Sequence, residues 1–362
     1  MKATTCFGLI CISLVAVKAT AQVFIGLQNA PNSVNSYPAL SGDGSTVVGK
    51  TGNTAMRWRV GTGLEAIPLS QSEGYASDVS HNGSVLAGNF QNSVIGHPAF
   101  GYSPSGEFPV PLNTFGVRVS SDGSTIAGSV TTPTGSYKAR LYKPLTNTII
   151  DLPSGVVPPG GVYFSPRPIV VTGISQNGQS VVGTASVLIG NPTEDFAPYL
   201  WNESTGTRYV TRNDGSRFLG FGADISDNGM VALVGENGVG SSGSPLYLYL
   251  GVGLLQPLGF NAVNGSPRLS GSGQTIVSYQ TVWQEGVGAR PLTTVLTQAG
   301  CNFAGGTNLT VTDVNFDGTV LTGNGTHLGV TEAWYAVIPA PGGVVTLVMC
   351  GGVMGARRRR VG

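Results

Sequence analysis

The sequence has few of the side chains that catalytic and metal sites usually need. Among 362 residues there are three histidines and four cysteines, and charged residues make up 10%. Neither a His-Glu-x-x-His nor a Gly-x-Ser-x-Gly motif occurs. A zinc site or a serine triad would therefore need residues from distant segments. We predict no enzyme activity and no cofactor.

Cysteine is too scarce for a disulfide framework. Cys6 and Cys11 lie near the N-terminus and Cys350 near the C-terminus, in segments that we predict to be sorting signals. Removal of both segments would leave Cys301 alone. We expect a free, buried thiol there; an intermolecular bridge is the alternative.

Basic residues are also scarce once the two ends are set aside. Of 19 Lys and Arg, six lie in residues 1–21 and 339–362, which contain no Asp or Glu. The body then carries 13 basic and 18 acidic residues, a net charge of 13 − 18 = −5. A mildly acidic surface argues against nucleic acid as a partner.

Glycine is abundant, at 55 residues, and much of it belongs to a repeat. The first copy runs from Ser41 to Gly49, with the sequence SGDGSTVVG. Asp-Gly or Asn-Gly between short apolar runs favours a tight hairpin, because Gly tolerates positive φ. The repeated turn glycines are at positions 44, 83, 123, 178, 229, 273 and 318, spaced by 39, 40, 55, 51, 44 and 45 residues.

Two more short segments follow each hairpin. The first contains an aromatic residue, such as Trp58, Trp201 or Trp334, and the second is rich in Leu and often contains Pro, which favours an edge strand. Four short strands in 40–50 residues are typical of a propeller blade. The last repeat lacks its fourth strand, whereas residues 23–27 supply an extra strand before the first repeat. We predict an all-β, seven-bladed propeller closed by this N-terminal strand; six or eight blades are the alternatives.

Residues 1–21 have the pattern of a secretion signal. Lys2 provides the positive start and residues 7–17 are apolar. Ala19 and Ala21 fit a small-x-small cleavage site before Gln22. We therefore predict three segments: the signal at 1–21, the propeller at 22–338 and a sorting segment at 339–362.

The sorting segment combines prolines, an apolar run and a basic cluster. Pro339 and Pro341 precede the uncharged residues 343–356, for which we predict a transmembrane-like helix, short for a span of about 20 residues. The positive-inside rule would keep the following arginines cytoplasmic. A buried final strand with a basic tail is the alternative. The basic cluster consists of Arg357, Arg358, Arg359 and Arg360.

These C-terminal residues resemble the PEP-CTERM sorting signal of Gram-negative bacteria, with Ala340 in place of the usual Glu. The resemblance implies export, transient anchoring in the inner membrane, removal of the tail by envelope sorting machinery and association with the envelope or exopolysaccharide. The repeats resemble the extracellular HAF-type family, which implies a secreted propeller-like domain without catalytic residues to transfer.

Two motifs suggest ligands that we do not predict. Residues 313–318 start like a calcium loop, but positions 9 and 12 of that loop are Leu321 and Asn324 instead of oxygen ligands with a final Glu. Turn chemistry also explains Asp313 to Asp317, and a bound cation is the alternative. Residues 238–243 match Gly-x-Gly-x-x-Gly, but a strand-like segment follows where a dinucleotide site needs a helix.

The two widest repeat spacings indicate insertions, which often carry binding. In the first, Tyr163 and Phe164 lie near Arg167, a combination that could stack on sugar rings or hold a peptide. A packed covering loop is the alternative. The second, residues 184–198, contains the acidic pair Glu194-Asp195, which we interpret as a solvated surface pair.

We therefore predict an exported protein of the cell surface, outer envelope or extracellular matrix, acting as a non-catalytic binding or structural module toward exopolysaccharide or surface proteins. A repeat filler of surface layers, without a small ligand, is another alternative. The alternative from a different class is a glycan hydrolase or lyase with its active site in the central cleft. Two or more carboxylates with a basic or aromatic partner on the axis would favour the enzyme, and a ring of turn Gly and Ser would favour the scaffold.

Overall fold

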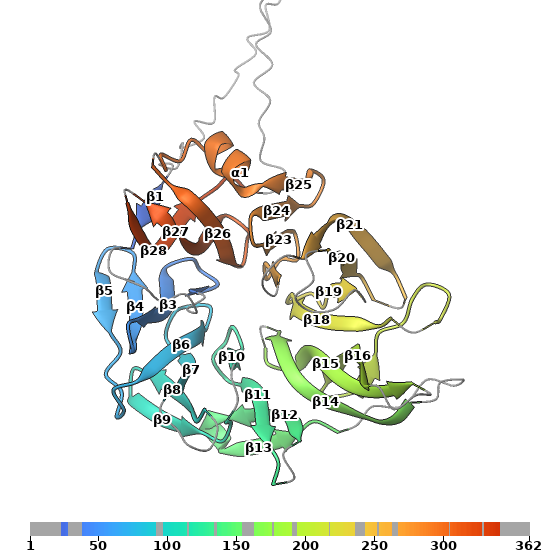
Figure 1. Ribbon diagram of the computed structural model, residues 1–362. Coiled ribbons are helices and arrows are strands. Elements are labelled where there is room, and N and C mark those ends of the chain that lie inside the picture. Colours follow the sequence, from blue (N-terminus) through green and yellow to red (C-terminus); the bar gives the residue numbers. More distant parts are fainter. Residues whose placement is uncertain are drawn as a thin grey trace, which may run out of the picture.

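The chain forms seven four-stranded antiparallel sheets arranged in a ring (Figure 1), which confirms the predicted propeller and its number of blades. The computed structural model describes residues 23–27, 38–91, 97–113, 116–133, 136–153, 163–175, 177–189, 194–216, 218–235, 243–251, 253–262, 267–303, 305–327 and 329–340. Within blades 1 to 6 the strands follow chain order from the axis outward.

The blades have the following strands. Blade 1 contains β2 (Ala39–Leu40), β3 (Thr46–Thr51), β4 (Thr54–Arg59) and β5 (Gly63–Ala66); blade 2 contains β6 (Gly74–Val79), β7 (Leu86–Phe90), β8 (Ala99–Ser103) and β9 (Gly106–Val110); blade 3 contains β10 (Arg118–Val119), β11 (Ile126–Thr131), β12 (Tyr137–Lys143) and β13 (Thr148–Asp151). Blade 4 contains β14 (Tyr163–Ile174), β15 (Ser180–Ile189), β16 (Glu194–Asn202) and β17 (Gly206–Tyr209); blade 5 contains β18 (Gly220–Ile225), β19 (Val231–Gly235), β20 (Ser244–Tyr249) and β21 (Leu255–Ala262). Blade 6 contains β22 (Arg268–Leu269), β23 (Thr275–Ser278), β24 (Thr281–Gln284) and β25 (Gly288–Pro291); blade 7 contains β26 (Thr307–Val314), β27 (Val320–His327), β28 (Val330–Val337) and β1 (Phe24–Gly26).

The N-terminal strand completes the last blade, as predicted. β1 pairs antiparallel with β28, with Phe24 opposite Ala336 and Gly26 opposite Trp334. The Phe24 ring stacks on the fully buried Trp334 at 5.6 Å between centroids. The two ends of the propeller are therefore held in one sheet, so the ring is closed.

The Ser-x-Asp-Gly repeat is a turn whose side chains bind its own backbone. Ser41 Oγ accepts the Thr46 N–H at 2.9 Å, and Asp43 Oδ1 accepts the Ser45 N–H at 2.9 Å. Gly44 has φ of 73°, which a residue with a side chain rarely adopts. The repeat therefore encodes the turn between the first two strands of each blade.

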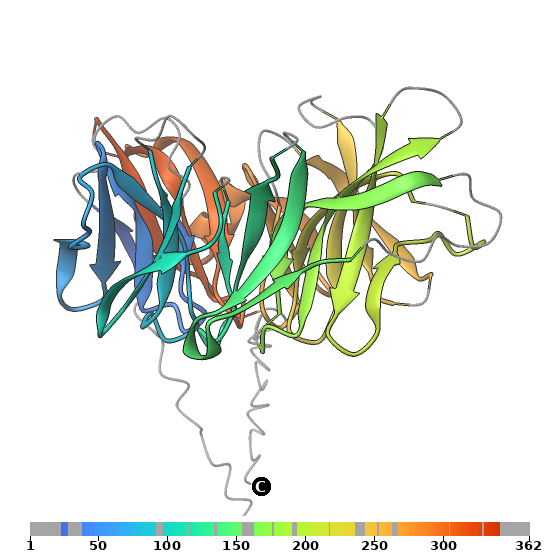
Figure 2. The ribbon, with the colours of Figure 1, turned by 90° about the horizontal axis from the view of Figure 1, so that it is seen from below.

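These turns define one side of the ring, which we call the turn face: the turns between the first and second strands and between the third and fourth strands of each blade. β1 begins and β28 ends on this face, where Val337 N–H donates to Val23 O at 2.9 Å and Ile338 N–H to Thr319 O at 2.7 Å. The long strands β14, β15 and β16 extend toward the opposite face (Figure 2).

Other expectations had mixed outcomes. Prolines do lie in outermost strands, at Pro109, Pro257 and Pro291. A short 3-10 helix, η1 (Pro144–Thr146), and a helix, α1 (Leu292–Gln298), were not predicted. α1 buries Leu292, Val295 and Leu296, but seven residues are too few for periodicity to distinguish a helix from a strand.

The predicted signal and sorting segments lie outside the described residues, apart from Pro339 and Ala340. The helix predicted over the C-terminal apolar run lies outside them too. Within the described ranges, no helix has both the length and the apolar character needed to cross a membrane.

Candidate functional site

Charged side chains from five blades meet at the axis of the ring. The position two residues before the turn Ser or Asn holds Asp78, Arg118, Asp224, Arg268 and Asp313 in blades 2, 3, 5, 6 and 7. All five line one polar cavity of about 90 Å³. Blades 1 and 4 have Ala39 and Gly173 there.

β-bulges introduce a register shift just before each axial Asp. The pairing of β6 with β7, of β18 with β19 and of β26 with β27 shifts immediately before Asp78, Asp224 and Asp313. A bulge leaves one residue unpaired and re-aims the side chains around it. Two of the unpaired residues donate to the next blade: Ser77 Oγ to Val117 O at 3.1 Å and Thr312 Oγ1 to Pro38 O at 2.7 Å.

Each axial Asp joins two blades through both carboxylate oxygens. Asp78 Oδ1 accepts the N–H of the next residue, Val79, at 2.9 Å, and Oδ2 accepts the N–H of Val119 in the next blade at 2.8 Å. Asp224 makes the same pair of bonds with Ile225 and Leu269, at 2.9 and 3.0 Å.

Asp313 repeats this geometry at the seam of the ring. Its oxygens accept the N–H groups of Val314 at 2.9 Å and of Leu40 at 2.8 Å, so it joins blade 7 to blade 1. Asp313 and Leu40 are 273 residues apart in the sequence. The first and last blades are therefore joined at the axis as well as through β1.

The two arginines are held differently. Arg118 Nε donates to Thr172 O at 2.8 Å in blade 4, and Nη1 donates to Val117 O at 3.3 Å. Arg268 lies between two carboxylates, with Nη1 3.9 Å from Asp224 Oδ2 and Nε 3.8 Å from Asp313 Oδ1. Arg268 is therefore the counter-ion of two of the three acids.

Burial shifts the proton affinities of this cluster. It raises the pKa of Asp313 to about 6, against the lowering effect of Arg268 and the Leu40 N–H, and it also raises the pKa of Asp224. Burial and the charge of Arg268 lower the pKa of Arg118 to about 10. Burial opposes the charge on Arg268, but Asp313 and Asp224 outweigh it and raise its pKa.

Backbone hydrogen bonds join neighbouring turns around part of the cavity. His81 N–H donates to Ser121 O, Ser272 N–H to Phe316 O and Phe316 N–H to Gly42 O, at 2.8, 2.8 and 2.9 Å. The His81 ring lies edge-on to Phe316 at 5.7 Å, and its Nδ1 is buried without a hydrogen-bond partner among the described residues. The axis therefore contains the charged cluster together with small turn residues such as Gly42, Ser121 and Gly271, so it combines features of the two criteria that the sequence offered as opposites.

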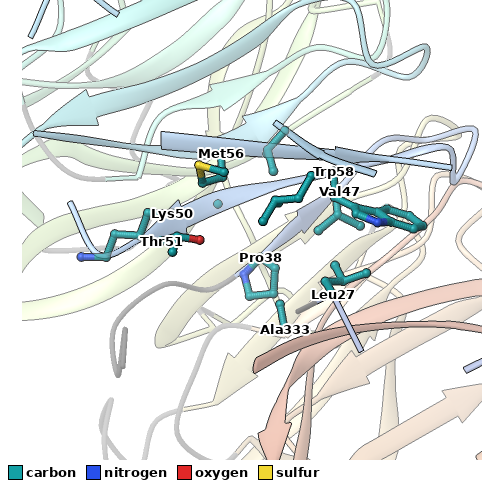
Figure 3. Close-up of a pocket in the computed structure, with 11 residues that line it drawn as sticks. Leu27, Pro38, Val47, Lys50, Thr51, Met56, Trp58 and Ala333 are labelled. Carbon is teal, nitrogen blue, oxygen red and sulfur yellow. The ribbon is translucent and has the colours of Figure 1, made fainter. Parts of the chain in front are cut away.

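A second small pocket lies at the seam between blade 7 and blade 1 (Figure 3). Its cavity of about 30 Å³ is lined mainly by apolar side chains, including Leu27, Pro38, Met56, Trp58 and Ala333. This volume is far below the 300–1,000 Å³ typical of ligand pockets. We interpret it as imperfect packing where the ring closes.

The predicted binding residues lie in a strand, not in a loop, which corrects that part of the prediction. Tyr163, Phe164 and Arg167 belong to β14, opposite Ile189, Leu188 and Ser186 of β15. The acidic pair Glu194-Asp195 starts β16. The insertions of blade 4 therefore lengthen its sheet, and the role of these residues stays a prediction.

The two aspartates of the calcium-like segment have different roles. The turn explanation was right for Asp317 and wrong for Asp313. Asp317 Oδ1 accepts the Thr319 N–H at 3.1 Å, as expected for a turn. Asp313, by contrast, is the axial carboxylate. Among the residues that the structure describes, no three potential ligands of the His, Cys, Asp and Glu types form a group suited to a metal ion.

The remaining candidates are separate in space. Most of the Gly-x-Gly-x-x-Gly segment lies outside the described residues, and strand β20 follows it, as predicted. His327 Nδ1 lies 3.1 Å from Glu332 Oε1 on the outer strands of blade 7, far in the fold from His81 at the axis. Cys301 is free and buried, which confirms the expected thiol, and burial raises its pKa.

Sequence reasoning missed the axial cluster although a signal was present. Asp78 and Asp224 stand at the same repeat position as Asp313, and Arg118 and Arg268 share that position. These residues stand two positions before the turn Ser or Asn, and turn formation alone was taken to explain the Asp at this position. Comparison of this one repeat position across all seven repeats would have identified the axial cluster.

Solved structures resemble this chain at low sequence identity. The β-propeller domain of the trilobed protease from Pyrococcus furiosus is 11% identical, with a TM-score of 0.53, over 83% of this chain and 95% of that one. That propeller has an open velcro topology, whereas β1 pairs with β28 here. TolB from Acinetobacter baumannii is 10% identical with a TM-score of 0.43, over 83% of this chain and 65% of that one. No family model and no curated protein sequence matches. The first similarity supports the propeller fold alone.

Proposed function

We propose that this chain is an exported, envelope-associated propeller that acts as a non-catalytic binding or structural module. The observation that carries the proposal is the engagement of all three axial carboxylates. Each accepts two backbone N–H groups and joins two blades. A carboxylate committed in this way holds the ring together, and each of its two oxygens already accepts one backbone N–H.

The size of the axial cavity supports the same proposal. Its volume of about 90 Å³ is well below the 300–1,000 Å³ of typical small-molecule sites. A sugar residue of a polysaccharide would have to displace the side chains that join the blades. Binding of exopolysaccharide or of a surface partner is therefore assigned to the outside of the ring.

Export is supported by the sequence patterns at the two ends. The predicted signal would be cleaved after Ala21, and the PEP-CTERM-like segment would anchor the chain transiently in the inner membrane before processing. Both segments join the propeller on the turn face, since β1 begins there and β28 ends there.

A second candidate, a glycan hydrolase or lyase, is favoured by one observation. Three acids and two arginines surround one cavity, and the pKa of Asp313, at about 6, suits a general acid near neutral pH. This is the axial composition that sequence reasoning named as the mark of an enzyme.

One experiment separates the two candidates. The purified protein is incubated with extracellular polysaccharide and a glycan array, and both retention and release of new reducing or unsaturated ends are measured. We expect retention without release. Release that is lost in Asp313→Asn but kept in Asp317→Asn, a turn residue outside the cavity lining, would contradict the proposal.

A mass measurement tests the envelope assignment. The native protein, recovered from the producing cells, should have lost residues 1–21. Before sorting it should carry the C-terminal segment, and afterwards its mass should fall by that of the removed tail. A protein that keeps residues 1–21 and stays in the cytoplasm would exclude export.

A further inference from the structure

Exposed apolar side chains recur in the outer hairpins of the turn face, in four of the blades. Half of the ten large apolar side chains that the described residues expose lie in the turns between the third and fourth strands of blades 1, 3, 5 and 6. Leu145 in η1 is the most exposed, at 92%. The five are Val60, Leu145, Leu250, Leu254 and Val287.

Each of these side chains is at least 45% exposed, so the isolated propeller forgoes part of the free energy that burying them would supply. Each lies in a hairpin at the rim of the ring, where polar turn residues would serve the turn equally well. Blades 2 and 4 show this alternative, with Ser105 and Ser204 in the same turns. Their recurrence on the side from which the C-terminal segment leaves the propeller suggests a surface that is covered while that segment is anchored.

The chain itself brings an apolar partner close to this face. β28 ends at Val337, and Ile338 is fixed by its hydrogen bond to Thr319 O on the turn face. Only the four residues from Pro339 to Gly342 separate Ile338 from the apolar run 343–356. Four extended residues reach roughly 14 Å at most, and the headgroup layer of a bilayer is roughly 5–8 Å thick on each side.

We propose that the turn face is a membrane-docking surface, with Val60, Leu145, Leu250, Leu254 and Val287 in the headgroup region of a phospholipid bilayer. The proposal rests on the proposed function, because it requires the C-terminal segment to be anchored. The tether is too short for the propeller to turn its opposite face, with the long strands of blade 4, toward the lipid.

The charges on this face identify the kind of lipid. The turn residues Asp43, Asp122 and Asp317 are acidic. Two basic side chains beside the apolar rim are paired, Arg59 with Glu65 at 3.6 Å and Lys143 with Glu203 at 2.9 Å. Basic groups paired in this way attract anionic headgroups only weakly. The surface fits a zwitterionic phospholipid.

The two ends of strand β12 provide a matched test. Leu145 follows the end of β12 on the turn face, and Tyr137 begins the strand on the opposite face, where it is 52% exposed. A fluorophore is attached at Leu145→Cys or at Tyr137→Cys in chains that also carry Cys301→Ala and Cys350→Ala. The chain is recovered from the membranes of producing cells and reconstituted in phosphatidylcholine vesicles that contain nitroxide-labelled lipid.

We expect quenching to be several-fold stronger at position 145 than at 137, with no increase when anionic lipid is added. Thermal unfolding of both labelled chains checks that they fold. Chains that co-float with vesicles but show equal quenching overturn the docking surface and leave the anchoring intact. Chains that do not co-float contradict the anchoring, and the docking surface with it.

Discussion

Four of the seven junctions between neighbouring blades fall into two contrasting groups, and the inner strands explain the difference. Where a bulged inner strand of six or eight residues precedes an inner strand of two residues, an Asp crosses the junction. This holds from β6 to β10, from β18 to β22 and from β26 to β2. Between β14 and β18, both long, the axial position is Gly173.

The comparison shows what the carboxylates do. A two-residue inner strand forms the edge of its sheet nearest the axis. Its N–H that points away from the rest of the sheet therefore has no partner strand to accept it. The Asp of the preceding blade accepts that N–H. At the junction of blades 4 and 5, with Gly173 at the axial position, the strands approach closely. Thr172 Oγ1 there donates to Gly222 O at 2.9 Å, a bond of the same type as those of Ser77 and Thr312 at two capped junctions. Short strands therefore need a side-chain cap, and long strands do not.

The largest effect should come from removing the counter-ion that two capped junctions share. Arg268→Met leaves Asp224 and Asp313 buried without their cation, which we expect to cost about 3–5 kcal/mol of unfolding free energy at pH 7.5. Urea denaturation measures it. Arg118→Met, which removes hydrogen bonds to two carbonyls, should cost less. Equal losses would mean that Arg268 acts through packing alone.

The two kinds of junction can be compared directly. Asp78→Ala leaves the N–H groups of Val79 and Val119 without an acceptor, for a loss of about 2–4 kcal/mol. Thr172→Val removes one hydroxyl bond at the uncapped junction, for about 1 kcal/mol. Urea denaturation of both variants measures the two losses of unfolding free energy. A larger loss for Thr172→Val would contradict the view that the capped junction depends more on its side chain.

The capped junctions should also respond to pH. The pKa of Asp313, at about 6, lies above its ordinary value of 3.8, so the folded state binds this proton more tightly. Stability therefore rises as pH falls from 7 through 6 toward 4, by about 3 kcal/mol at most for this group. Asp313→Asn should remove this part of the pH dependence. Wild-type stability that falls steadily below pH 6, with the same slope in the variant, would contradict it.

A last prediction concerns the close approach of the strands at the uncapped junction. A Cβ at Gly173 would lie 2.9 Å from Asp224 Cα in the next blade. Gly173→Ala should therefore cost about 1–3 kcal/mol through overpacking. Gly206→Ala is not a suitable control, because Gly206 has positive φ. Gly49→Ala is the matched control, since its Cβ would meet only Pro38 Cα, at 3.8 Å.

Much of the fold followed from the sequence, and the site did not. The turn residues Ser41, Asp43 and Gly44 act within one hairpin, so their spacing alone revealed blades and their number. The axial residues Asp78, Arg118 and Asp224 act between blades. Their partners are backbone groups of another repeat, whose position depends on how far one blade rotates against the next.

The sequence by itself determined the strands, their order and the closing strand, because hairpins of adjacent segments are specified by local turn chemistry and by alternating apolar residues. Only the tertiary structure decided that Asp313 meets Leu40, that Arg268 lies between two acids and that Leu145 shares a face with the C-terminal exit. Those contacts arise when seven sheets close into a ring, and closure brings together residues that no local pattern relates.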